Sequence, residues 1–337
     1  MISCLRRAGV EVVERHEPVW EGREHKFGAG LGSAVRLAAA QIRLRRERES
    51  DSDSQFDVVV VGYPGHFDLG TARRVARDRP VVFNPLVSLA DTLVGDRARF
   101  RARGLAARAL VAIDRRAFRA ADLVVADTAA QAEFFTTLGA RRVETCFVGA
   151  EERFFRPGWN APPDFTALFV GKLIPLHGLE TVLAAARLAP ELRFRVVGSG
   201  QLDRLLDDRP RNVQHVPWIE YERLPHELHR ASCALGIFGT SAKAARVIPN
   251  KVFQALACAT PVVTADTPAA RELLRDRESA LLVTPGDPQA LAAVLRKLAA
   301  DRELAESLSE AGLGGYRAHA SEDVLGAHWR DLIQSLL

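Results

Sequence analysis

The chain has 337 residues, of which 47% are hydrophobic and 26% are charged, and its formal net charge is +4. A single hydrophobic core stops growing below this length, so we expect two domains. No apolar run approaches the roughly 18 residues that span a bilayer, and the four cysteines show neither disulfide nor metal spacing. Composition therefore excludes a membrane-spanning protein and a disulfide scaffold, and indicates a cytoplasmic protein with reduced thiols.

From residue 56 onward, short runs of β-branched residues alternate with helical patterns, which is typical of βαβ units around a parallel sheet. In the first half, the runs predict strands at residues 10–13, 58–61, 81–83, 123–125 and 143–148. Thr128 precedes Gln131 by three residues, a capping-box pattern that predicts the start of a helix. The first half therefore reads as one doubly wound domain.

The pattern breaks over 150–163, in the Pro/Gly-rich stretch GAEERFFRPGWNAPPDF, which we interpret as a domain linker. A second series of strands is expected at 167–170, 194–197, 213–216, 234–238, 261–264 and 280–283, followed by amphipathic helices at 287–299 and 301–335. The predicted fold is α/β with two Rossmann-like doubly wound domains. We expect an N-terminal domain over 1–155, a C-terminal domain over 156–320, and a terminal helix over 321–337 that crosses back to the first domain.

The beginning of the chain departs from this scheme. A doubly wound domain opens with a buried strand and a glycine-rich turn, whereas MISCLRRAGVEVV is typical of the end of a helix followed by a second strand. The first strand is therefore expected to be missing, either because the true start lies upstream or because the domain is shortened. The glycine-rich FGAGLG at 27–32 follows no strand, so we interpret it as a chance match to a nucleotide loop.

Ligands of open parallel sheets sit at the carboxyl ends of strands, and phosphates favour helix N-termini. Two loops of the second half, VGKLIPLHGLE and VVGSGQL, follow strands in this way. In the first, Gly171 permits a close backbone approach, and Lys172 and His177 are candidates to face a diphosphate; the alternative is a surface lysine. In the second, Gly198 and Gly200 fit a tight turn, which many α/β proteins use without a ligand.

Two further loops complete the set, FGTSAKAARVIPNKVFQ and TADTPAARELL. The third loop supplies Asn250 as a candidate N-cap, with Lys251 next to it. In the fourth, Glu272 lies one turn into a helix, where it either reaches the crevice or is an ordinary solvated residue. The order and spacing of the four loops indicate an anion-binding crevice more strongly than any one of them does.

This order of motifs resembles the retaining nucleotide-sugar glycosyltransferases of the GT-B fold, the group 1 or family-four enzymes, which include glycogen-synthase-like and mannosyltransferase-like members. The similar segments are FVGKLIPLHGLETVLAAA, VVGSGQ and KVFQALACATPVVTADTPAARELL, with ADLVVADTAAQ and VGAEERFFRP in the first half. The resemblance implies two domains facing a cleft, with a nucleotide-sugar donor on the second. It also implies a sugar, lipid-linked or small-molecule acceptor on the first, and transfer with retention, without a metal and without a cofactor.

The resemblance also implies roles for individual residues. Lys172 and Lys251 would hold the donor pyrophosphate and offset the charge of the leaving group, because pre-placed cations stabilise negative charge that develops in a transition state. Trp218 and Ile219, in VPWIEY, would flank the nucleobase. For Trp218, the alternative is packing at the domain surface.

Two positions depart from the family pattern, which has two glutamates where this chain has Arg246 and Gln254. The carbonyl oxygen of Gln254 can still accept a hydrogen bond from a ribose hydroxyl, although a neutral acceptor is weaker than a charged one. Arg246 cannot accept a hydrogen bond. Contact with the sugar is then expected from Lys243, from the main chain of 239–241 or from Glu272.

On the acceptor side, the family often places a histidine at a strand end. His66, in GYPGHFD, is the nearest substitute here; the alternative is a surface histidine. The arginine-rich stretch over 96–121 is expected to form a basic helix. It is either a solvated face or a docking surface for anionic lipid near the acceptor, which would make the protein peripheral at the inner membrane face. Nucleic acid is not an expected partner, because the basic region has few aromatic residues.

Two other interpretations remain open. A nucleotide-sugar epimerase of the same fold would need acid/base carboxylates and histidines in the cleft, and the first half has few. A catalytically silent homologue that binds a nucleotide or a partner would explain both the missing strand and the loss of the two glutamates.

Overall fold

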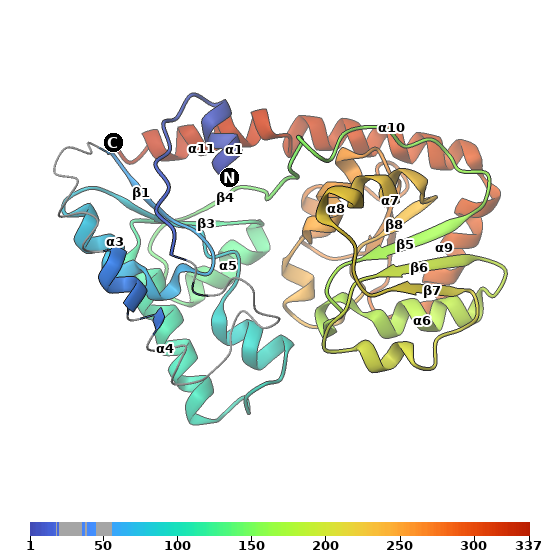
Figure 1. Ribbon diagram of the computed structural model, residues 1–337, viewed down its shortest axis with the longest axis horizontal. Coiled ribbons are helices and arrows are strands. Elements are labelled where there is room, and N and C mark those ends of the chain that lie inside the picture. Colours follow the sequence, from blue (N-terminus) through green and yellow to red (C-terminus); the bar gives the residue numbers. More distant parts are fainter. Residues whose placement is uncertain (18, 20–35, 38, 45–55) are drawn as a thin grey trace.

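The structure is a computed structural model that describes residues 1–17, 19, 36–37, 39–44 and 56–337. It contains two parallel β-sheets, each flanked by helices, which lie side by side (Figure 1). The two Rossmann-like halves predicted from the alternating pattern are confirmed. The segment FGAGLG lies outside the described residues.

The first sheet has the strand order β1-β2-β3-β4, and all of its strands are parallel. The strands are β1 (Val59–Val61), β2 (Val81–Phe83), β3 (Leu123–Ala126) and β4 (Val143–Thr145). The α-helices of this half include α1 (Ile2–Arg7), α3 (Leu69–Ala76), α4 (Leu105–Ala120) and α5 (Ala129–Thr137). The strand expected at 10–13 is wrong. Val10 and Val12 pack against the core beneath α1, but Val13 is 71% exposed, and the backbone of this segment pairs with no strand among the described residues.

The second sheet has the order β10-β9-β8-β5-β6-β7, again with all strands parallel. Its strands are β5 (Thr166–Val170), β6 (Arg193–Val197), β7 (Val213–Val216), β8 (Cys233–Leu235), β9 (Val262–Ala265) and β10 (Leu281–Val283). Its helices are α6 (Leu179–Leu188), α7 (Leu224–Arg230), α8 (Asn250–Ala257), α9 (Pro288–Ala300) and α10 (Arg302–His319). The order of strands along the chain reverses between β5 and β8, so the loops that follow these two strands flank the crevice where such sheets bind ligands.

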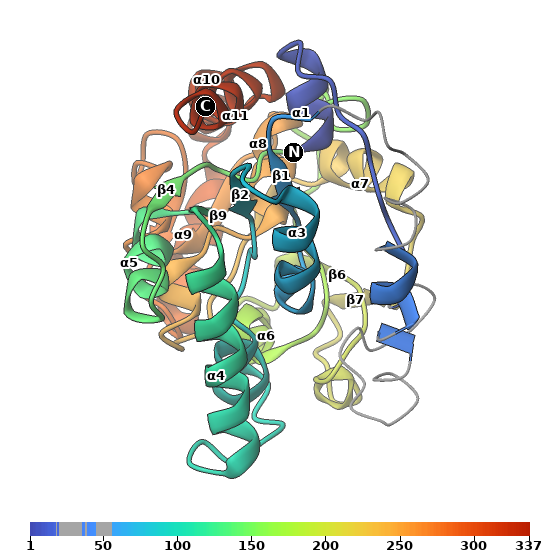
Figure 2. The ribbon, with the colours of Figure 1, turned by 90° about the vertical axis from the view of Figure 1, so that its left-hand side faces the viewer.

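The last helix, α11 (Glu322–Gln334), lies against the first half of the molecule. Leu325, Trp329 and Leu332 share a buried cluster with Cys4 and Leu5 of α1. Figure 1 shows α10 and α11 running along one side of both halves, and Figure 2 shows α11 beside α1 near the two termini.

The expected single helix over 301–335 is wrong. It is divided at Ser321, whose extended backbone (φ −67°, ψ 154°) ends one helix axis and starts another. In the part of the chain that the structure describes, no helix is both long enough and apolar enough to span a membrane.

Candidate functional site

The crevice at the reversal point is built from two loops whose backbones touch. Gly178, at the start of α6, has φ +66°, and a Cβ placed there would lie 2.5 Å from the carbonyl carbon of Phe238 in the loop after β8. A Cβ on Gly239 would lie 2.4 Å from the carbonyl oxygen of Leu176. Only glycine allows this approach, so these two residues fix the loops against each other and set the shape of the crevice.

Three of the residues singled out in the sequence come together in this crevice. Gly171 follows β5 with φ +139°, and a Cβ there would lie 3.2 Å from Cε1 of His177 and 3.3 Å from Cε of Lys251. The loop after β5 and the first turn of α8 thus converge, although 80 residues separate Gly171 from Lys251 in the sequence.

Lys251 and His177 bring buried polar atoms to this point. The Nζ atom of Lys251 is buried, lies 3.7 Å from the centroid of the Phe169 ring, and has no hydrogen-bond partner among the described residues. Burial lowers the pKa of Lys251 well below its usual value. Burial, and secondarily Lys251, do the same to the pKa of His177, whose Nδ1 also lacks a partner in the described part of the chain. A buried donor without an acceptor costs free energy that an arriving anion would recover.

The other glycines of the predicted loops support this arrangement from behind. A Cβ on Gly198 would lie 2.0 Å from the carbonyl oxygen of Gly171, and one on Gly200 would lie 2.7 Å from that of Leu173. Their lack of a side chain lets the loop after β6 pack under the loop after β5. Contact of these two glycines with a ligand stays a prediction. Lys172, between Gly171 and Leu173, is exposed.

One turn further along α8, Gln254 is half-buried beside the crevice. Its Nε2 donates to the hydroxyl of Tyr221, which lies in the loop after β7, at 3.4 Å. Gln254 and Lys251 also line a small cavity whose other walls are apolar: Leu168, Val170, Leu224, Leu228, Ala234 and Leu235. The amide therefore lies at the edge of the pocket that contains the buried lysine.

Two sequence expectations for this region change. Asn250 is not the N-cap of α8 but its first helical residue, because Pro249 adopts the extended conformation (φ −72°, ψ 148°) of the cap position. Trp218 and Ile219, expected together at the nucleobase, differ in environment. Trp218 is 68% exposed, whereas Ile219 packs against the hydrophobic cluster around α8.

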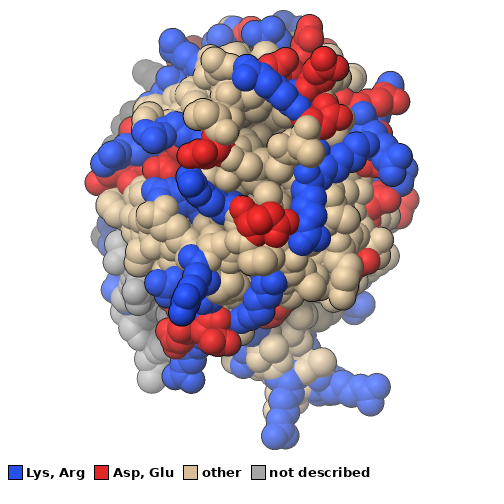
Figure 3. Space-filling model, turned by 90° about the vertical axis from the view of Figure 1, so that its right-hand side faces the viewer, with Lys and Arg blue, Asp and Glu red and all other residues tan. Residues whose placement is uncertain are grey.

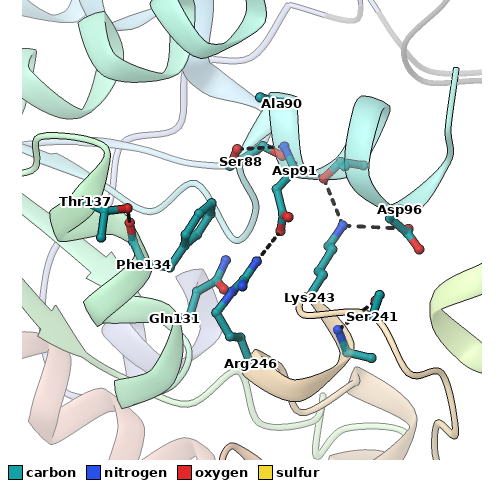
Figure 4. A network of polar contacts seen from close by, with 12 residues as sticks. Ser88, Ala90, Asp91, Asp96, Gln131, Phe134, Thr137, Ser241, Lys243 and Arg246 are labelled. Atoms are coloured by element: carbon teal, nitrogen blue, oxygen red, sulfur yellow. Dashed lines mark hydrogen bonds and ion pairs between the residues drawn. The ribbon is translucent and has the colours of Figure 1, made fainter. Parts of the chain in front are cut away.

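Two basic residues in the loop after β8 reach across to the first domain (Figure 4). A guanidinium nitrogen of Arg246 lies 2.8 Å from Oδ2 of Asp91, and the guanidinium stacks 4.1 Å above the Phe134 ring. Nζ of Lys243, which is 5% exposed, donates to the Thr92 hydroxyl at 2.9 Å and lies 3.9 Å from Asp96. Lys243, which we expected at the sugar, and Arg246 are therefore both engaged by the segment that follows β2.

Glu272 also lies at the contact between the domains. Its two carboxylate oxygens accept hydrogen bonds from the backbone amides of Ala129 (2.7 Å) and Ala130 (3.0 Å), at the start of α5. Thr128, the N-cap of α5, accepts from the Gln131 amide as the capping pattern predicted, and its hydroxyl donates to the carbonyl oxygen of Arg246 at 2.5 Å. These two hydrogen bonds place the negative charge of Glu272 at the N-terminus of α5, where the helix dipole favours it.

His66 is wrong as an acceptor-side residue. Its side chain has 0% exposure, packs edge-on against Phe83 and Phe118, and places Nε2 3.4 Å from the carboxylate of Asp114 on α4. Burial lowers the pKa of His66, with Asp114 acting in the opposite direction. The short helix over Gly65–Phe67 turns the ring into the core, which the sequence pattern at a strand end did not indicate.

The acidic side of the interdomain contact was not predicted from the sequence. Asp91, Thr92 and Asp96 lie on one π-helical segment after β2, in the sequence SLADTLVGD. Two carboxylates flanking a short apolar run after a strand were a usable signal, since the carboxyl ends of parallel strands face the crevice. Asp127, after β3, was missed as well. Burial raises its pKa to about 7, with Glu272 acting in the same direction.

Two Rossmann-like domains, and a glycine-lined crevice with a buried lysine amine and a buried histidine ring, define a protein of the GT-B class. Profiles of two related domain families match almost the whole chain: a "Glycosyl transferase 4-like domain" over residues 3–150 and "Glycosyl transferases group 1" over residues 164–301. The chain belongs to the group 1 glycosyltransferases.

Individual proteins agree with this assignment. The chain is 30% identical to a D-inositol 3-phosphate glycosyltransferase of Geodermatophilus obscurus, over 81% of this chain and 66% of that protein. It is 29% identical to a protein of the same description from Catenulispora acidiphila, over 69% and 60%. The chain thus spans about two thirds of the length of these relatives.

Solved structures share the fold at low sequence identity. Sucrose-phosphate synthase of Thermosynechococcus elongatus superposes with a TM-score of 0.72 at 16% identity, covering 89% of this chain and 79% of that one. Anabaena HepE in complex with UDP-glucose superposes with a TM-score of 0.68 at 18% identity, covering 87% and 82%.

Proposed function

We propose that the protein transfers a sugar from a nucleoside-diphosphate sugar to an acceptor hydroxyl, with retention of configuration at the anomeric carbon. The observation that carries this proposal is the meeting of Gly171, His177 and Lys251 at the reversal point of the second sheet. A glycine that admits an approaching backbone or phosphate, next to a buried cation-forming group without an acceptor, suits a pyrophosphate better than a neutral ligand.

In this proposal the second domain binds the donor. Lys251 and the exposed Lys172 contact the pyrophosphate from two sides, and Gln254 hydrogen-bonds the ribose. The bond from the anomeric carbon to the diphosphate oxygen breaks, and a bond to the acceptor oxygen forms on the same face. The acceptor's proton passes to the departing diphosphate. The lysines lower the barrier because the negative charge of the leaving group increases as the bond breaks.

We propose further that the reaction proceeds without an added metal ion, because Lys172 and Lys251 supply positive charge where the diphosphate departs. Activity that is unchanged by a chelator, and that falls when either lysine is neutralised, is the expected result. Activity that disappears with the chelator and returns with a divalent cation would contradict this part of the proposal.

The acceptor would lie on the first domain. Two curated relatives are named D-inositol 3-phosphate glycosyltransferases, and a third, 23% identical, is named a lipopolysaccharide core biosynthesis glycosyltransferase. These names support a sugar, a lipid-linked sugar or a small polyol as the acceptor class.

The proposal is tested first by binding. A thermal-shift panel of UDP-, GDP-, ADP- and dTDP-sugars should contain at least one ligand that raises the melting temperature, because a ligand that binds only the folded state stabilises it. The best donor is then offered to candidate acceptors, and release of the nucleoside diphosphate is measured. Indifference to every donor would refute the proposal. Binding without transfer to any acceptor would reduce it to a nucleotide-binding homologue.

A further inference from the structure

The exposed face of α4 carries a group of arginines without acidic partners. Arg108, Arg115, Arg116 and Arg119 are all exposed. Within the part of the chain that the structure describes, none of the four forms an ion pair. Arg115 and Arg119 follow Arg108 by seven and eleven residues, which places these three arginines on nearly one side of the helix.

Several arginines elsewhere on the surface have acidic partners. On α9 and α10, Arg296 lies 2.6 Å from Glu191, and Arg302 lies 2.7 Å from Glu306. This difference does not follow from the composition, because the net charge of the whole chain is only +4. The α4 face is therefore a local concentration of uncompensated positive charge.

The one acidic residue of α4 faces inward. Asp114 has a fully buried side chain that accepts hydrogen bonds from the Ser88 hydroxyl (2.6 Å) and from the amides of Leu89 (2.9 Å) and Ala90 (3.0 Å). It anchors α4 to the segment after β2 and leaves the outer face without negative charge. This anchoring makes the arginine array rigid relative to the first domain.

The surface around these arginines is partly apolar and projects from the molecule. The four arginines share an open groove of about 690 Å³ with small apolar side chains: Ala102, Ala107, Val111, Ala112 and Ala120. At the N-terminal end of the helix, Leu105 is 83% exposed. Figure 2 shows α4 extending below the rest of the fold. In Figure 3 the projection at the lower edge carries basic side chains, whereas the remainder of that face mixes both signs.

We propose that this arginine face, with Leu105, docks on an anionic lipid surface. A projecting helix can be reached by a flat bilayer, whose anionic headgroups match an array of unpaired cations. The arginine stems and Leu105 supply apolar contact at the headgroup boundary. Single-stranded nucleic acid is a poorer match, because the one aromatic residue of α4, Phe118, is buried and cannot stack on bases.

Docking through α4 would fix the first domain at the membrane. Asp114 ties the helix to Ser88 and Ala90, and the next residue, Asp91, meets Arg246 of the second domain. The domain proposed to bind the acceptor would therefore rest on the lipid surface. The proposal itself does not depend on which sugar is transferred.

The test uses the full chain and vesicle flotation, with phosphatidylcholine alone or mixed with phosphatidylglycerol. Wild-type protein is expected to float only with the mixed vesicles. Arg108→Gln/Arg115→Gln should weaken this partition more than tenfold, since each arginine near an anionic surface contributes about fivefold. The matched control, Arg296→Gln/Arg302→Gln, has the same net charge and should float like wild type. Arg108→Lys/Arg115→Lys keeps the charge and should also float.

Leu105→Ser separates insertion from simple attraction: it should reduce flotation several-fold while the dependence on salt stays as in wild type. Wild-type protein that floats equally with both vesicle types, or with neither, overturns the proposal. An equal loss in both glutamine variants overturns it as well, because overall charge would then be the cause. If the α4 variant loses affinity for a labelled oligonucleotide but still floats, the surface binds nucleic acid instead.

Discussion

Replacing Lys251 with methionine should change stability and affinity in opposite directions. The buried Nζ atom has no hydrogen-bond partner in the described part of the chain, and only the Phe169 ring, at 3.7 Å, compensates it. An unsatisfied buried polar group costs about 1–3 kcal/mol. Lys251→Met keeps about the same side-chain length and removes this cost, so the ligand-free protein should gain about 1–3 kcal/mol in unfolding free energy.

The same substitution should weaken nucleotide binding. A charge-assisted hydrogen bond to phosphate contributes about 1.5–3 kcal/mol, which corresponds to a loss of about 10- to 100-fold in affinity for the nucleoside diphosphate. Urea unfolding gives the first quantity, and isothermal titration calorimetry gives the second. The control is Lys297→Met, an exposed lysine on α9 in the same domain, which should change neither.

Because the pKa of Lys251 is lowered, we also expect nucleotide binding to depend on pH. Burial lowers the pKa of the ligand-free amine, and an adjacent diphosphate raises it again, so binding should take up a proton. Affinity should then fall as the pH rises above the lowered pKa of the free protein. Calorimetry in two buffers with different ionisation enthalpies measures this uptake, and Lys251→Met should abolish it.

The lowered pKa of Lys251 also determines how the stability of the ligand-free protein changes with pH. Between the lowered pKa of the folded state and the unfolded value near 10.4, only the unfolded chain holds the proton, so stability rises with pH in that range. If Lys251→Met is less stable than wild type and binds the nucleotide with unchanged affinity, Lys251 does not bind the diphosphate and instead supports the fold.

Three further results are expected. Asp127→Asn should be about 1–4 kcal/mol more stable than wild type near pH 8 but nearly equal near pH 4. The reason is the raised pKa of the aspartate, which makes wild-type stability fall as the pH rises between about 4 and about 7; urea unfolding at both pH values measures this. A double-mutant cycle of Arg246→Gln and Asp91→Asn should give a coupling energy of about 0.5–3 kcal/mol in the same assay, and a value of zero would mean that the ion pair does not join the domains. His66→Gln should lower stability by about 1–3 kcal/mol and leave kcat unchanged, whereas a large loss of kcat without loss of stability would restore its catalytic role.

The sequence predicted the surroundings of Lys251 better than those of His66. Gly171, His177 and Lys251 were found because each follows a strand or starts a helix, and the carboxyl ends of parallel strands necessarily meet at one edge of the sheet. His66 satisfied the same rule and was still misplaced. The rule fixes where a backbone segment ends, but a three-residue helix then decides whether the side chain points to solvent or to the core.

Contacts between the domains escaped the sequence analysis for a different reason. Arg246 was recognised as an anomaly, but its partner Asp91 is 155 residues away and belongs to the other domain. No local periodicity or cap connects the two positions. The same holds for Glu272, which looked like a crevice residue until the start of α5 was found against it.

The order of strands and helices, the division into two domains and the loops that hold the lysines were determined by the sequence alone. Each of these depends on local periodicity, glycine placement and helix starts, which a linear chain displays directly. Only the tertiary structure decided that Lys251 is buried without a partner, that His66 is a core residue and that Arg246 is paired with Asp91. Burial and pairing depend on which distant segments pack together, and that is a property of the assembled sheets rather than of any one segment.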